Sequence, residues 1–199
     1  MRQGRTAPIR PLIILLLLAG YLLGAWFQGA KVNTHLHAHD QSAYMNYAKG
    51  LRAEGYLTHE GDRNRMPIYP GLIGLFYRPG MSDEAFFRRA KIVNVVLSLL
   101  LLAGTWFILR RWLPRAHTDL LTAVTAFTVF MFKAPYVQCE LLFYFLNFCA
   151  FVTMWRCLRE PTLLRGGLAG LLAALAHLTK AAMLPAVALF GICFLIGRL

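Results

Sequence analysis

The sequence contains little acidic charge and few cysteines. Only 9 of its 199 residues are Asp or Glu, and charged residues of either sign make up 15% of the chain. About a quarter of the residues in a soluble domain are normally charged, so this composition disfavours an ordinary soluble protein. The four cysteines form no Cys-x-x-Cys pair, which leaves both a zinc site and a disulfide framework without support.

Apolar residues are abundant, and they occur in blocks. Hydrophobic residues make up 58% of the chain and gather in runs such as Leu12–Leu18, Val95–Ala103 and Leu141–Val152. This pattern excludes a disordered or collagen-like chain. It predicts an all-α integral membrane protein with several transmembrane helices.

The formal net charge of +12 arises from 21 Lys and Arg residues. On a soluble protein, such a charge would suggest a nucleic-acid surface. In a membrane protein, the Lys and Arg excess of the cytoplasmic side accounts for much of it. We therefore expect a lipid bilayer as partner and no nucleic acid.

The apolar runs predict about six transmembrane helices in a single module that covers residues 1–199. The expected spans are 11–30, 92–109, 120–133, 141–158, 166–180 and 185–197. The first run has a basic start like that of a signal peptide, but it is long for a signal core and no clear cleavage site follows directly. Because the sixth run is short, we expect the chain to be a fragment of a longer protein or a minimal module.

The arginines predict the orientation of these spans. Those placed on the cytoplasmic side by this topology are Arg2, Arg5, Arg10, Arg110, Arg111, Arg115, Arg156, Arg159, Arg165 and Arg198. The short outer turns hold only Lys133 and Lys180, in agreement with the positive-inside rule. We therefore expect residues 31–90 and the active site to face outward from a bacterial inner (plasma) membrane.

The long first extracytoplasmic loop, residues 31–90, contains two short helical patterns. The segment Asp40–Gly55 carries a stripe of apolar residues, with Asp40 in position to cap the helix and Gly55 to end it. The segment Pro70–Tyr77 is apolar and bounded by prolines. Both are too short or too polar to span, so we expect them to lie along the membrane face.

Four motifs occur in a particular order along the chain. They are Asp40-Gln-Ser-Ala-Tyr44-Met-Asn-Tyr-Ala48, then Arg65-Met-Pro67-Ile-Tyr69-Pro70, then Glu140 at the start of the fourth span, and finally the glycine-rich stretch from Gly167 to Lys180. In order and spacing, this set resembles the GT-C superfamily of membrane glycosyltransferases, and within it the branch with protein mannosyltransferases and lipid A aminoarabinose transferases. The resemblance covers only the N-terminal part of such proteins. The chain also departs from it at Gln41, where many relatives have a second acidic residue.

The resemblance implies transfer of a sugar from a polyprenyl-phosphate donor to a hydroxyl acceptor on a glycan, lipid or protein. An inverting transfer needs a base to take the acceptor's proton, and Asp40 is the candidate, with Glu140 as a second catalytic residue. The leaving phosphate needs cations, for which Lys180, Arg63 and Arg65 are candidates. Tyr44 is placed among the substrate-binding residues. No cofactor is expected.

Each of these residues also has a structural interpretation. Asp40 could serve only as a helix cap, Glu140 as a favourable charge at a helix N-terminus, and Lys180 as a determinant of topology. Tyr44 could be an interfacial aromatic. The alternating His35, His37 and His39 could hold a divalent metal, although no carboxylate other than Asp40 lies at ligand spacing.

Two other functions stay open at the level of the sequence. One is a non-catalytic membrane protein, such as a carrier-lipid flippase or an accessory subunit of a cell-envelope glycan pathway. A transporter more often places its charged site near the bilayer midplane, whereas Asp40 and Glu140 are expected at the outer face. The other is a scaffold in which residues 31–90 bind a soluble partner.

Overall fold

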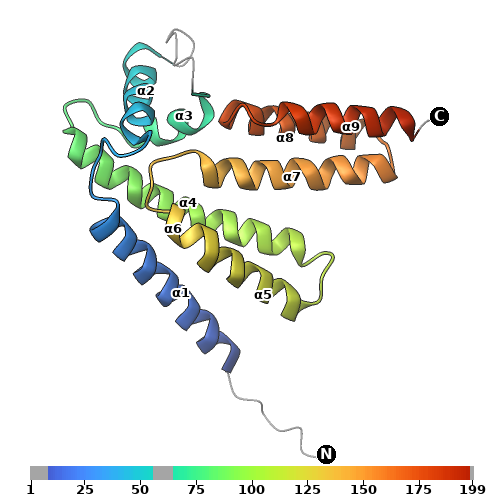
Figure 1. Cartoon of the computed structure of the whole chain (residues 1–199), viewed down its shortest axis with the longest axis horizontal. Coiled ribbons are helices and arrows are strands. Elements are labelled where there is room, and N and C mark those ends of the chain that lie inside the picture. The colour runs from blue at the N-terminus through green and yellow to red at the C-terminus, as the bar shows by residue number, and fades with distance from the viewer. Residues whose placement is uncertain (1–8, 56–64, 198–199) are drawn as a thin grey trace, which may run out of the picture.

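The computed structural model describes residues 9–55 and 65–197, and this part of the chain is helical without a β-strand (Figure 1). The prediction of an all-α protein is therefore confirmed. The helices are α1 (Ile9–Phe27), α2 (Gln41–Glu54), α3 (Ile68–Gly74), α4 (Asp83–Leu109), α5 (Arg115–Thr125), α6 (Met131–Lys133), α7 (Glu140–Arg159), α8 (Leu163–Thr179) and α9 (Leu184–Ile196), with π-helical turns η1 (Gln28–Val32) and η2 (Ala126–Phe130).

Within the described residues, three helical segments are long and apolar enough to cross a membrane. They are Pro11–Val32, Asp83–Leu109 and Glu140–Arg159. The helices α8 and α9 are apolar but shorter, and the third expected span corresponds to α5, η2 and α6 in succession. The chain thus has the helices of a membrane protein, while the number of six spans stays a prediction.

Helix α4, which contains the second expected span, begins well before residue 92 and inside the segment expected to be loop. Helix α4 starts at Asp83, because the Ser82 hydroxyl accepts a hydrogen bond from the Ala85 amide and caps the helix. The carboxylates of Asp83 and Glu84 in the first turn also favour this start through the helix dipole. The apolar run alone could not reveal these two polar turns.

The two helices expected within the loop are present. Helix α2 matches the predicted segment and ends at Gly55, whose φ of 94° suits glycine and whose amide bonds to the Leu51 carbonyl. The expected segment Pro70–Tyr77 is shifted, because α3 begins at Ile68 and ends at Gly74. After Gly74, the amides of residues 75–77 donate to the carbonyls three residues earlier. This tighter hydrogen-bond pattern replaces that of the α-helix and ends it.

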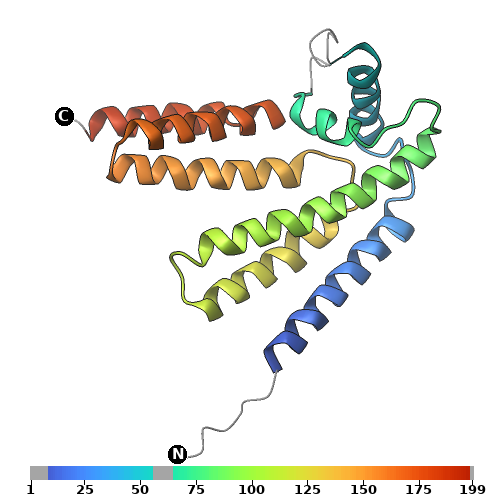
Figure 2. The same cartoon turned by 180° about the vertical axis from the view of Figure 1, so that it is seen from behind.

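The long helices fan out from one end of the molecule, where α2 and α3 pack against them (Figures 1 and 2). This α2–α3 end consists of α2, α3, η1, the first turns of α4, residues 134–139 and the C-terminal end of α8. Its buried core includes Met45, Tyr69, Ile73, Phe86 and Val137. Segments far apart in the sequence therefore meet there.

A buried polar network holds three of these segments together. The Asn33 side-chain amide donates to Gln41 Oε1 at 2.7 Å and to the Pro135 carbonyl at 2.8 Å. In return, Gln41 Nε2 donates to Asn33 Oδ1 at 2.8 Å, and the Val137 amide donates to Gln41 Oε1 at 3.0 Å. Gln41 thus fixes the end of η1 and the start of α2 against the segment that leads into α7.

Candidate functional site

The first ion pair of the α2–α3 end joins Asp40 to Arg65. Arg65 Nη2 donates to Asp40 Oδ1 at 2.8 Å, and 66% of the Asp40 side chain is exposed. Asp40 occupies the N-cap position of α2, but its side chain makes no capping hydrogen bond. The capping interpretation of this carboxylate is therefore wrong, and the group is accessible from solvent.

The second ion pair joins Glu140, the first residue of α7, to Lys180, which directly follows α8. Because α7 and α8 pack side by side in opposite directions, the start of one lies beside the end of the other (Figure 1). Lys180 Nζ lies 3.4 Å from Glu140 Oε1. The second oxygen, Glu140 Oε2, is buried and has no hydrogen-bond partner in the part of the chain that the structure describes.

Tyr44 connects the two ion pairs. Its hydroxyl lies 3.0 Å from the Cys139 sulfur, next to Glu140, and the Arg65 guanidinium carbon lies 5.6 Å from the centroid of its ring. The Tyr44 ring also meets the Tyr69 ring edge to face, at a centroid distance of 5.3 Å. The Tyr69 hydroxyl in turn donates to Asn94 of α4 at 3.1 Å.

Burial controls protonation in this network. It raises the pKa values of Tyr44 and Tyr69 well above the usual value, so both hydroxyls keep their protons at neutral pH. Burial likewise raises the pKa of the Cys139 thiol, which argues against a thiolate nucleophile. At Lys180, burial lowers the pKa, but the neighbouring groups, chiefly the Glu140 carboxylate, together leave the pKa raised. Lys180 is therefore a cation at neutral pH.

The structure brings five of the six residues selected from the sequence into one contact network, namely Asp40, Tyr44, Arg65, Glu140 and Lys180. The sixth, Arg63, lies outside the described residues. No group of three or more His, Cys, Asp or Glu side chains that could hold a metal ion occurs among the described residues. The His39 ring instead meets the Tyr136 ring at a centroid distance of 5.5 Å.

Sequence reasoning gave no role to Cys139 or Tyr69, which complete the network. Tyr69 lies between Pro67 and Pro70 in a motif already noted, and Cys139 directly precedes Glu140. Both neighbourhoods were visible in the sequence. Their mutual contact through Tyr44 depends on how α2 and α3 pack onto the start of α7, and no periodicity in the sequence reports that packing.

The fold and the network define the class of the protein as helical, with segments long and apolar enough to span a membrane and a network of polar side chains at one end. No family model, curated protein or solved structure matches the chain. The resemblance to the GT-C superfamily consequently stays a prediction drawn from the ordered motifs.

Proposed function

We propose that the protein transfers a sugar from a polyprenyl-phosphate donor to a hydroxyl acceptor, with inversion at the anomeric carbon. The reaction takes place at the extracytoplasmic face of the membrane. The observation that carries this proposal is the pairing of two carboxylates with two cations in one network, at the end where the candidate spans converge. A reaction that forms an anionic leaving group from a lipid needs bases and cations close to the membrane.

In the proposed reaction, Asp40 is the general base. The acceptor oxygen attacks the anomeric carbon, the bond from that carbon to the phosphate oxygen breaks, and the acceptor's proton moves to the Asp40 carboxylate. Arg65 holds one oxygen of this carboxylate, while the exposure of the side chain leaves room for an acceptor. Glu140 is assigned a supporting catalytic role, since it keeps Lys180 charged and in place.

The leaving phosphate departs as a stable anion and needs no proton. Lys180 and Arg65 are the proposed phosphate ligands, because they are the cations that the network contains. Tyr44 lies between them and supports the substrate site by holding Arg65 and the residue before Glu140 in place. This arrangement requires no metal or organic cofactor.

The substitution Asp40→Asn in proteoliposomes tests this assignment. With radiolabelled polyprenyl-phosphate mannose and polyprenyl-phosphate aminoarabinose as probes, we expect transfer to fall by about 10²–10⁴-fold, because the amide keeps the shape but not the basic oxygen. Donor binding should change little. Asp119→Asn is the matched control, since Asp119 accepts a hydrogen bond from Trp106 far from the network and an amide oxygen can still do so.

The substitution Lys180→Ala should instead weaken donor binding, since its charge meets the phosphate in both the ground state and the transition state. Near-normal transfer in Asp40→Asn would remove Asp40 from the mechanism. If the wild-type protein binds the donor and moves it across the bilayer without transferring the sugar, the protein is a carrier-lipid flippase and the transferase proposal fails.

A further inference from the structure

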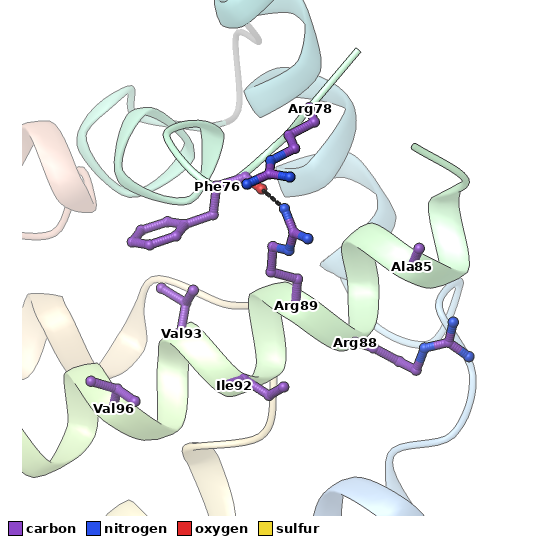
Figure 3. Close-up of a pocket in the computed structure, with 8 residues that line it drawn as sticks. All are labelled: Phe76, Arg78, Ala85, Arg88, Arg89, Ile92, Val93 and Val96. Carbon is purple, nitrogen blue, oxygen red and sulfur yellow. Dashed lines mark hydrogen bonds between the residues drawn. The ribbon is translucent and has the colours of Figure 1, made fainter. Parts of the chain in front are cut away.

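Two pockets flank a ridge on the N-terminal half of α4. The α3–α4 pocket, about 640 Å³, lies between α4 and the segment after α3 and includes Phe76, Arg89 and Val93 (Figure 3). The α1–α4 pocket, about 470 Å³, includes Leu22 and Trp26 of α1. Both pockets share the same three residues of α4, which form the ridge between them: Arg88, Ile92 and Val96.

The ridge and the catalytic network lie on different faces of α4. At 3.6 residues per turn, Arg88, Ile92 and Val96 follow one stripe of the helix. Phe86, Ala90 and Asn94 are buried on the opposite side, where they pack toward α2 and α3. The thickness of α4 therefore separates the two pockets from Tyr44 and Cys139.

One end of the ridge is strongly cationic. Arg88 and Arg89 come one turn before Ile92 and Val93, and Arg78 approaches from the segment after α3 (Figure 3). Arg89 donates to the Phe76 carbonyl at 3.1 Å, but none of these three arginines forms an ion pair in the described part of the chain. Asp83, in the first turn of α4, is instead bound by Lys49 at 2.9 Å.

The rest of the ridge is apolar and uncovered. Ile92 is 66% exposed and Val96 53% exposed, and Leu100 continues the stripe at 64%. These residues belong to a helix that is long and apolar enough to span a membrane. Side chains on a helix lean toward its N-terminus, and Arg88 accordingly points away from this apolar stripe and toward the start of α4 (Figure 3).

We propose that the ridge binds an anionic diacyl phospholipid of the surrounding bilayer. The lipid phosphate lies over the ridge, between Arg88 on one side and Arg78 with Arg89 on the other (Figure 3), and one acyl chain occupies each pocket. The unpaired arginines select a negative headgroup. The presence of two pockets astride one ridge favours a lipid with two chains over the single chain of a polyprenyl phosphate. This site is independent of the proposed transfer reaction.

Trp26 provides a direct probe, because it lines the α1–α4 pocket. We would replace the other tryptophans in the variant Trp106→Phe/Trp112→Phe/Trp155→Phe and reconstitute the full chain in phosphatidylcholine vesicles. Bromine-labelled phosphatidylglycerol or bromine-labelled phosphatidylcholine is then added at equal mole fraction. At low mole fraction, the brominated anionic lipid should quench the fluorescence of Trp26 more than the brominated zwitterionic lipid does.

The double substitution Arg88→Gln/Arg89→Gln should remove this preference, with a loss of about fivefold in relative affinity per arginine. Arg88→Lys/Arg89→Lys keeps the charge and should retain most of it. The matched control Arg110→Gln/Arg111→Gln removes two charges from the other end of α4 and should leave the preference intact. Equal quenching of the wild-type Trp26 by the two lipids would overturn the proposal, as would a preference that survives Arg88→Gln/Arg89→Gln. Circular dichroism would verify that every variant is helical.

Discussion

The two ends of the helical bundle are both rich in cations, yet their surroundings differ. At the α2–α3 end, Arg65 and Lys180 are paired with carboxylates and joined through Tyr44. At the opposite end, Arg156 lies 5.1 Å from the Trp112 ring centroid and Arg159 lies 4.2 Å from that of Trp155. One end joins two ion pairs through a buried tyrosine, whereas the other stacks two cations on tryptophan rings and has one ion pair, Arg165–Glu160 at 2.6 Å, whose carboxylate is 74% exposed.

This difference indicates that the α2–α3 end is a candidate binding site and that the opposite end anchors the helices at the membrane surface. Arg and Trp together are typical of a membrane–water interface, where the ring and the cation both tolerate a mixed environment. Buried side chains such as Gln41 and Asn33 must instead be matched donor to acceptor, and the match fixes their positions. We therefore expect the α2–α3 end to be sensitive to small chemical changes and the opposite end to tolerate them.

The largest expected effect is that of Gln41→Glu. Gln41 Nε2 donates to Asn33 Oδ1 and to the carbonyls of His35 and Ala38, and a carboxylate would face these acceptors without a proton to give. An uncompensated buried charge typically costs about 3–5 kcal/mol. The free energy of unfolding in mixed micelles measures this loss.

The control for that substitution is Gln138→Glu. The Gln138 side chain is half-buried and makes no hydrogen bond in the described part of the chain, so we expect a loss below about 1 kcal/mol. Equal losses in the two variants would contradict the account of the Gln41 network. They would also imply that the buried Gln41 side chain is no more tightly specified than the half-buried Gln138 side chain at the same end.

A smaller effect is expected from a glycine in the contact between α4 and α7. A Cβ at Gly104 would lie 2.8 Å from the Phe145 ring, so Gly104→Ala should destabilise the protein by about 1–3 kcal/mol. Gly170 on α8 has nothing within 4 Å of such a Cβ. Gly170→Ala should therefore stabilise it by about 0.5–1 kcal/mol through helix propensity. The same unfolding measurement compares both, and a stabilised Gly104→Ala variant would rule out the close packing.

The smallest effect appears only at alkaline pH. Burial raises the pKa of Tyr44 and Tyr69 in the folded protein above the usual value near 10. Their contribution to stability is thus fully present below pH 10 and is lost as the pH rises toward the folded pKa values, by up to about 1.4 kcal/mol per tyrosine per pH unit. Tyr44→Phe should flatten this decline in unfolding free energy between pH 10 and 11. An unchanged slope would mean that Tyr44 is not buried.

The sequence predicted the helices well where apolar runs or a capping pattern defined them. Helix α2 matches its predicted bounds because an apolar stripe and Gly55 mark both its face and its end. The start of α4 was missed because its first two turns are polar, and hydropathy does not register the cap at Ser82. The shift of α3 has a similar cause, since hydrogen bonding and not composition ends that helix at Gly74.

The candidate site was predictable residue by residue but not as a network. Asp40, Glu140 and Lys180 could be selected because charged residues beside apolar runs are conspicuous. The contact of Tyr44 with Cys139 spans 95 positions and depends on packing between helices, which leaves no periodic trace in the sequence. Gln41 was noted only as a departure from the motif, whereas its place in the buried network supplies a structural role.

The central claim is that the α2–α3 end binds the phosphate of the lipid donor and the opposite end does not. Removal of two charges from each end tests it most directly, with Arg65→Gln/Lys180→Gln compared with Arg156→Gln/Arg159→Gln in the same liposomes. The dissociation constant for polyprenyl-phosphate mannose should rise at least about tenfold in the first variant, because each charged hydrogen bond is worth about 1.5–3 kcal/mol. It should change less than about twofold in the second, whose cations stack on exposed tryptophans. Equal weakening in both variants, or none in the first, would contradict the claim.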